Sequence, residues 1–306
     1  MFRTVRVDSN LAEALESVGT KRKFWFSQKS WLFKAEERGT GEDWAEKIAC
    51  ELAGRVGLPH VTYELAEEYD GPTYRQPGVV CPHCALPPLN LVLGNQLLLA
   101  RDPNYPGEVQ RRYKVKEYTA TAVAECIEQL AIPSAEWTRN LPNEINTARG
   151  VFVGYIMLDA WVANQDRHHQ NWGAIRVPDQ ATMLLAPTFD HGASLARNLS
   201  NEERKDRLNS RDAGRQLPNF AKRALSRFCA SPADHRLLST LDAFSRFAEV
   251  DSAAARVWLN ELERVTPDEI QFIVQEVPPN RMSEIAHVFT QELLLENQRR
   301  LLQLPL

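Results

Sequence analysis

The chain has 306 residues, a hydrophobic fraction of 43%, a charged fraction of 25% and a formal net charge of −4. These values are typical of a globular protein that can bury a sizeable core, and the slight acidity argues against a dedicated nucleic-acid-binding protein. No apolar run reaches the roughly 18 residues that a membrane span needs, the polar start is not a signal peptide, and five scattered cysteines fit reduced thiols. We therefore expect a cytoplasmic protein that does not cross a membrane.

The first hundred residues predict a small sheet with one long helix. Apolar spacing indicates a short helix over residues 9–18, and two aromatic-rich runs, Phe24–Phe26 and Trp31–Lys34, predict a β-hairpin. A helix is expected from Trp44 to Val56, where Gly57 is a stop signal. Further strands are expected at residues 60–66 and 78–81, and the apolar stretch 89–100 is interpreted as the last strand of this sheet and a hinge.

The remainder of the chain predicts mainly helices. Residues 101–116, rich in Pro, Gly and charges, indicate a linker or loop. Ser231 and Thr266 are each followed by Pro, which is an N-cap signal. Helices are expected over residues 118–130, 150–163, 234–247, 252–263, 266–275 and 282–302.

Polar chemistry is concentrated between Leu158 and Leu195. Residues 171–177 and 181–186 predict two strands joined by a Pro-Asp-Gln turn, which would bring Asn171 back to the residues before Asp190. Asp166 precedes this hairpin, so two carboxylates and one amide oxygen are expected at its open end. Oxygen ligands of this kind suit Mg²⁺, which also binds phosphate groups.

The spacing of these residues indicates phosphoryl transfer. Asn171 follows Asp166 after five positions, the interval D-x-x-x-x-N of a kinase catalytic loop. In that loop the Asp accepts the proton of the substrate hydroxyl and the Asn binds a metal, while a second Asp, here Asp190, bridges the metal and the phosphates.

The segments NQDRHHQNWG and LAPTFDHGASL, residues 164–173 and 185–195, resemble the signature of the HipA-like kinases. This resemblance implies an α+β, two-lobed protein-kinase-like fold, with a β-rich N-lobe at residues 1–100 and a mainly helical C-lobe at residues 101–306. It implies Asp166 as the catalytic base and Asn171 with Asp190 as ligands of Mg²⁺. It further implies ATP as the phosphate donor, a protein substrate with a Ser or Thr acceptor, and an antitoxin partner; we expect no direct nucleic-acid binding.

The resemblance also extends to the nucleotide-binding residues of the first lobe. Lys34 ends the second strand of the hairpin, where a kinase lysine contacts the α- and β-phosphates, and Glu46 is expected to pair with it. Glu42 and Glu51 are the rival candidates for this pairing. The remaining candidates for contact with ATP are His168 and the loop Gly19, Thr20 and Lys21, although this loop could also be an ordinary turn.

Two other classes of function stay open. In a metal-dependent phosphohydrolase the ligands would be Asp166, His168, Asp190 and His191, but Lys34 would have no role. A catalytically silent binding module is the other class. Cys81 and Cys84 form a C-x-x-C pair, and the prolines that follow do not begin the helix of a redox motif, so we interpret them as loop thiols.

Overall fold

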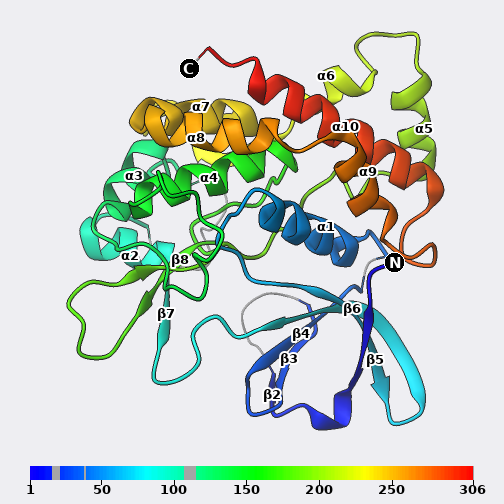
Figure 1. Cartoon of the computed structure of the whole chain (residues 1–306), viewed down its shortest axis with the longest axis horizontal. Coiled ribbons are helices and arrows are strands. Elements are labelled where there is room, and N and C mark those ends of the chain that lie inside the picture. Colours follow the sequence, from blue (N-terminus) through cyan, green and yellow to red (C-terminus); the bar gives the residue numbers. More distant parts are fainter. Residues whose placement is uncertain (16–20, 38, 107–114, 306) are drawn as a thin grey trace.

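The computed structural model describes residues 1–15, 21–37, 39–106 and 115–305. It is a mixed α/β fold, with a β-sheet lobe at the bottom of Figure 1 and a larger helical region above it. No helix within these ranges is both long enough and apolar enough to cross a bilayer.

The large sheet has six strands in the order β1-β5-β6-β4-β3-β2. Strands β3 and β4 form the expected hairpin. The helix expected at residues 9–18 is not formed at residues 9–15, the part of it that the structure describes, so that prediction is wrong there. There a single 3-10 turn, η1 (Ser9–Leu11), is followed by β2, because Ala14 and Leu15 pair with β3. The bounds are β1 (Thr4–Asp8), β2 (Ala14–Leu15), β3 (Lys23–Phe26), β4 (Trp31–Ala35), β5 (Glu64–Asp70) and β6 (Thr73–Pro82).

Helix α1 (Glu42–Arg55) lies between this sheet and the helical region (Figure 1). Every residue from Asp43 to Cys50 is buried, so the helix is packed on more than one side. The expected helix at residues 44–56 is confirmed. Because the helix is held from both sides, polar groups near its first turns have fixed positions.

The chain leaves the large sheet after β6 and enters a second, three-stranded sheet. This sheet contains β7 (Asn90–Leu93), β8 (Gly173–Arg176) and β9 (Leu184–Leu185), and Val92 pairs with Ala174. The interpretation of residues 89–100 as the last strand of the first sheet and a hinge is therefore wrong, since β7 pairs with the expected hairpin and α2 (Gly94–Arg101) follows it. Residues 83–89 form the connection instead.

The helical region follows the expected pattern in part. The helix expected at residues 234–247 begins later, because Leu237–Ser239 pairs with a strand and Ser239, not Ser231, is the N-cap of the helix. Two short helices, α5 and α6, form at residues 201–209 and 217–221, where none was expected. Thr266 makes the expected capping box with Glu269. The bounds are α3 (Ala120–Ile127), α4 (Ala148–Trp161), α5 (Asn201–Asn209), α6 (Leu217–Ala221), β10 (Leu225–Cys229), β11 (Leu237–Ser239), α7 (Thr240–Val250), α8 (Ser252–Glu263), α9 (Pro267–Gln275) and α10 (Glu284–Leu302).

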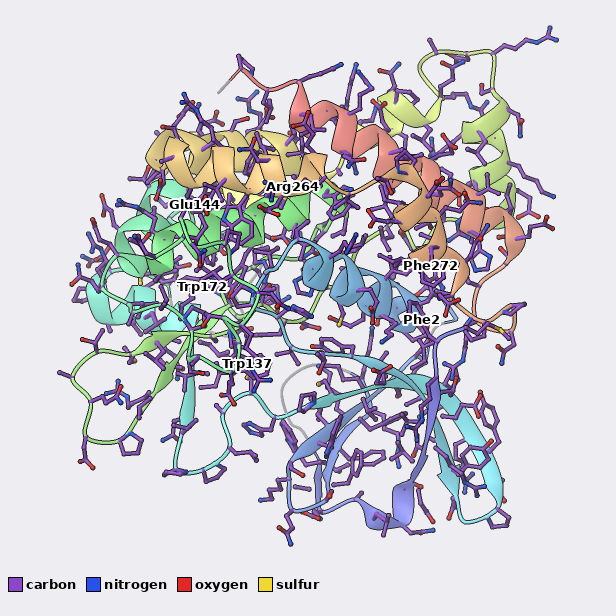
Figure 2. All side chains as sticks on the ribbon, viewed as in Figure 1. Phe2, Trp137, Glu144, Trp172, Arg264 and Phe272 are labelled. Atoms are coloured by element: carbon purple, nitrogen blue, oxygen red, sulfur yellow. The ribbon has the colours of Figure 1, made fainter. Side chains whose placement is uncertain are left out.

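Helix α4 is the centre of the helical core, with every residue except Arg149 buried. Helix α8 approaches it closely at Gly154, where an added Cβ would lie 2.5 Å from the ring of Trp258. Trp172, labelled in Figure 2, packs edge-on against Phe152 of α4 with ring centroids 5.4 Å apart. The loop that follows α4 therefore starts from a rigid support.

Candidate functional site

A cleft of 780 Å³ lies between the six-stranded sheet, α1 and the loops around the three-stranded sheet. Lys34, Asp166, Asn171 and Asp190 line it together, as the sequence predicted. Its apolar lining includes Leu32, Val61, Val79, Cys81, Ala85, Leu91 and Leu93. Pockets that combine an apolar wall with a few convergent polar groups are typical binding sites for small molecules.

Lys34 and Asp190 form an ion pair across the cleft, with Lys34 Nζ 3.0 Å from Asp190 Oδ1. Burial alone would lower the pKa of Lys34, but the negative charge of Asp190 raises it well above its ordinary value. Burial would likewise raise the pKa of Asp190, but Lys34 and then Lys23 lower it below its ordinary value. Both groups are therefore charged at neutral pH.

Tyr63, a residue to which the sequence assigned no role, lies beneath this ion pair. Its hydroxyl accepts hydrogen bonds from Lys34 Nζ and from the backbone N–H of Asp190, both at 3.3 Å. The ammonium of Lys34 also lies 5.1 Å from the centroid of the Tyr63 ring, a cation–π distance. Asp190 has a left-handed φ of 63°, which is uncommon for a residue other than Gly, and the hydrogen bond from its N–H helps to hold this conformation.

Glu46 was expected to pair with Lys34. Among the described residues Lys34 pairs with Asp190 instead, so that expectation is wrong. Glu46 Oε1 accepts a hydrogen bond of 2.6 Å from the backbone N–H of His191, and this side chain is only 3% exposed. The carboxylate lies near enough to raise the pKa of Lys34, although less than Asp190 and Tyr63 do. Glu46 thus ties α1 to the residue after Asp190, and its contribution to ATP binding stays a prediction.

The loop from Asn164 to Asn171 is fixed by its own side chains. Asn164 Oδ1 accepts a hydrogen bond from the backbone N–H of Asp166 at 3.1 Å, and Asn171 Nδ2 donates to the backbone carbonyl of Asp166 at 2.7 Å. Because the amide nitrogen of Asn171 is used in this way, its Oδ1 is the atom available to a ligand. The five-residue interval seen in the sequence therefore closes a compact turn.

Arg167 connects this loop to the segment before Asp190. Its guanidinium, 1% exposed, makes two hydrogen bonds to the Asp159 carboxylate and donates to the carbonyl of Asn171 at 2.6 Å. It also donates to Thr188 Oγ1 at 2.9 Å and to the carbonyl of Phe189 at 3.4 Å. Arg167 lies too deep to reach a ligand in the cleft, so it positions the loop.

Arg227 of β10 lies beside Asp166, although 61 residues separate them in the chain. Its Nη2 and Nε lie 3.2 Å and 3.3 Å from Asp166 Oδ1. His168 Nε2 lies 3.9 Å from the other carboxylate oxygen, and His168 lines the same cleft. The carboxylate of Asp166 therefore lies between two basic side chains.

The mouth of the cleft near α1 is rich in charge. Glu42, one of the rival candidates for pairing with Lys34, instead pairs with Lys21 and Arg197. Arg197 also donates to the hydroxyl of Thr40. Glu51, the other rival, pairs with Lys47. Lys21 lines the cleft, whereas Gly19 and Thr20 lie outside the described residues.

The geometry does not support the ligand set expected for a transition-metal phosphohydrolase. His191 is 1% exposed, and its Nε2 lies 2.9 Å from Thr188 Oγ1 and 3.0 Å from an Arg167 guanidinium nitrogen. A cationic neighbour and a buried position exclude this nitrogen from a shared metal site with Asp166. Among the residues that the structure describes, no three His, Cys, Asp or Glu side chains are grouped as metal ligands.

Cys81 and Cys84, interpreted above as loop thiols, both line the cleft. Cys81 lies in strand β6, where it pairs with Leu32 of β4, so that interpretation is wrong for Cys81, whereas Cys84 lies in the connection between the sheets. All five cysteines are free thiols. Burial raises the pKa of Cys81 to about 12 and that of Cys84 to about 11, so both thiols are protonated at neutral pH.

The comparisons with known proteins identify the fold. No protein-family model matches the chain, and no curated protein sequence matches it. The solved structure of the Helicobacter pylori proinflammatory kinase CtkA matches with a TM-score of 0.68 and 19% identity, over 96% of this chain and 95% of that chain. HipA of Shewanella oneidensis, solved in a toxin–antitoxin complex with HipB and operator DNA, matches with a TM-score of 0.58 and 12% identity, over 94% of this chain and 65% of that chain. The chain has a HipA-like kinase fold.

Proposed function

We propose that this chain, whose fold is that of HipA-like kinases, is an ATP- and Mg²⁺-dependent kinase that phosphorylates Ser or Thr residues of a protein. The observation that carries the proposal is the single cleft of 780 Å³ in which Lys34, Asp166, Asn171 and Asp190 converge. Phosphoryl transfer depends mainly on positioning and charge neutralisation, and these are the residue types that provide both.

The apolar lining of the cleft suits a nucleobase, and its polar groups suit the phosphates. Lys34 would bind the α- and β-phosphates, and Lys21, at the mouth of the cleft, would add positive charge near the γ-phosphate. Lys34 is already charged and held by Asp190 and Tyr63, so little reorganisation is needed when the triphosphate binds. The connection at residues 83–89 would lie beside the base.

The donor set fits Mg²⁺. Asn171 uses its amide nitrogen in the turn, and Asp190 uses Oδ1 for Lys34, so each has a further oxygen for a hard cation. Mg²⁺ bound there would neutralise charge on the phosphates. This pair of oxygen ligands also explains why Asn171, which a transition-metal hydrolase would not need, lines the cleft.

Asp166 would orient the acceptor hydroxyl and take its proton. The backbone of Asp166 is fixed by hydrogen bonds with Asn164 and Asn171, and its carboxylate pairs with Arg227. The base is therefore already positioned when the acceptor hydroxyl binds. This proton transfer contributes less to the rate than charge neutralisation at the phosphates.

The partner and location in the cell follow from the same proposal. A Ser or Thr protein substrate fits a hydroxyl acceptor at Asp166, and an antitoxin partner is proposed because the Shewanella HipA structure contains HipB. Free thiols at all five cysteines support a location in the cytoplasm.

Incubation with γ-labelled ATP and Mg²⁺, alone and with a cell lysate, tests the proposal. We expect label on the protein itself or on a lysate protein, and we expect Asp166→Asn and Asp190→Asn to lose it. Transfer that survives in both variants would refute the assignment of the site.

A further inference from the structure

A long segment leaves the mouth of the cleft and returns to it. Arg197 and Arg227 both line the cleft, and the residues between them form α5, α6 and the start of β10. At the first end Arg197 pairs with Glu42, and at the second Arg227 lies 3.2 Å from Asp166 Oδ1. The segment 197–227 is therefore bounded on both sides by the site.

The apolar side of this segment packs next to the loop that carries Asp166. Leu217 and Ala221 of α6 form a buried cluster with Ala163, three residues before Asp166, and with Phe289 and Leu293 of α10. Most charged side chains of the segment are exposed, whereas Arg204 is buried. The segment therefore presents a charged surface and is anchored to the stretch that leads into Asp166.

That surface carries a net positive charge. The segment 197–227 contains nine Lys or Arg and four Asp or Glu, a formal net charge of +5, in a chain whose formal net charge is −4. Among its exposed side chains five are Lys or Arg and three are Asp or Glu. Three of its acids are engaged, since Glu203 caps α5, Asp206 pairs with Arg215 and Asp212 accepts a hydrogen bond from the backbone of Gly214. Four cations are exposed and make no ion pair with any described residue: Lys205, Arg211, Lys222 and Arg223.

We infer that this basic surface, defined by Lys205, Arg211, Lys222 and Arg223, docks an acidic segment of the protein substrate, so that a Ser or Thr beside that segment reaches Asp166. The inference rests on the proposed function and adds the substrate class. An acidic segment needs such a surface, because the triphosphate and the rest of this acidic chain would otherwise repel it. Complementary charge across an interface selects partners and speeds their encounter.

Two peptides of equal length with one central Ser test the inference, one flanked by Asp and Glu and the other by Gln. Wild-type protein should phosphorylate the acidic peptide with a kcat/KM roughly tenfold above that of the neutral peptide, and the difference should shrink as salt is added. The double variant Lys222→Glu/Arg223→Glu should lose this preference. The matched control is Lys116→Glu/Arg256→Glu, which changes the net charge equally at exposed positions outside the segment and should keep it.

Two further readouts separate this inference from the proposed function. ADP release without peptide reports the kinase site alone, and neither double variant changes a residue that lines the cleft. Fluorescence anisotropy of the labelled acidic peptide with the Asp166→Asn protein reports docking without turnover. If wild type forms neither ADP nor phosphopeptide, the proposed function fails, and the binding measurement alone decides the docking inference.

Equal kcat/KM and equal binding for the two peptides would overturn the inference, as would an equal loss in the control variant. A duplex oligonucleotide that displaces the acidic peptide and binds more tightly would also overturn it, because the surface would then serve nucleic acid.

Discussion

Arg167 and Asp159 form a buried bidentate ion pair, with the two N–O distances at 2.7 Å and 2.9 Å and side-chain exposures of 1% and 5%. The same guanidinium donates to the carbonyl of Asn171 and to the hydroxyl of Thr188. One interaction therefore joins the end of α4, the loop with Asp166 and the segment before Asp190.

Asp159→Ala should destabilise the protein by roughly 3–5 kcal/mol, because it leaves the buried guanidinium of Arg167 without its counter-charge. Urea unfolding measures this change. The double variant Asp159→Leu/Arg167→Met should recover part of the loss, since no unpaired charge remains buried. A loss below about 1 kcal/mol in the single variant, the value of an exposed pair, would contradict the buried arrangement.

His169 should make folding sensitive to acid. Burial lowers the pKa of His169 to about 4, and its Nδ1 lies 2.7 Å from the hydroxyl of Tyr105. Between the unfolded pKa near 6.5 and about 4, the unfolded state binds more protons, so stability falls as pH falls through this window. His169→Gln should reduce the slope of stability against pH there, while His235→Gln, at an exposed position, should leave it unchanged. An unchanged slope in the first variant would refute the prediction.

Cys84 offers a direct report of nucleotide binding. It lines the cleft, whereas Cys126 of α3 does not, and burial raises the pKa of each thiol to about 11. Mg²⁺-ATP should slow alkylation of Cys84 by N-ethylmaleimide severalfold and leave Cys126 unaffected, as peptide mass spectrometry after timed labelling at alkaline pH will measure. Equal protection of both thiols would indicate general rigidification rather than occupancy of the cleft.

Lys34 and Glu46 should differ in their effects on ATP. Lys34→Met removes a charge-assisted contact to phosphate and should weaken Mg²⁺-ATP binding about tenfold or more in calorimetry. Glu46→Gln keeps an oxygen that can accept from the backbone N–H of His191, so we expect a change of only a few-fold. An equal loss in the two variants would mean that Lys34 pairs with Glu46 once nucleotide is bound.

The local pattern of the sequence predicted the elements that carry the site. The hairpin of β3 and β4, helix α1 and the convergence of Asp166, Asn171 and Asp190 follow from spacing and turn residues close together in the chain. The partner of Lys34 was not predicted correctly, because the kinase resemblance implied a carboxylate of the following helix, whereas Asp190 lies 156 residues away.

Residues that act through distant contacts gave no signal in the sequence. Tyr63, directly before β5, contacts Asp190, and Arg227 of β10 contacts Asp166, and only the folded chain brings these residues together. The stretch 89–100 was misplaced for a related reason: an apolar run indicates burial, but it does not identify which strand it will pair with. Trp172 precedes β8, and its contacts with Gly94 and Phe152 form only in the folded chain.

The balance of products from ATP tests the central claim most directly. The protein is incubated with ATP, Mg²⁺ and lysate proteins, and ADP, free phosphate, phosphoserine and phosphothreonine are measured together, with a chelator in a parallel reaction. We predict that the amount of phosphoserine and phosphothreonine equals the amount of ADP formed. The chelator should stop the formation of ADP and of the phosphorylated residues, and the Asp190→Asn variant should form neither. ADP matched by free phosphate, or formed equally without Mg²⁺, would contradict a kinase in this cleft.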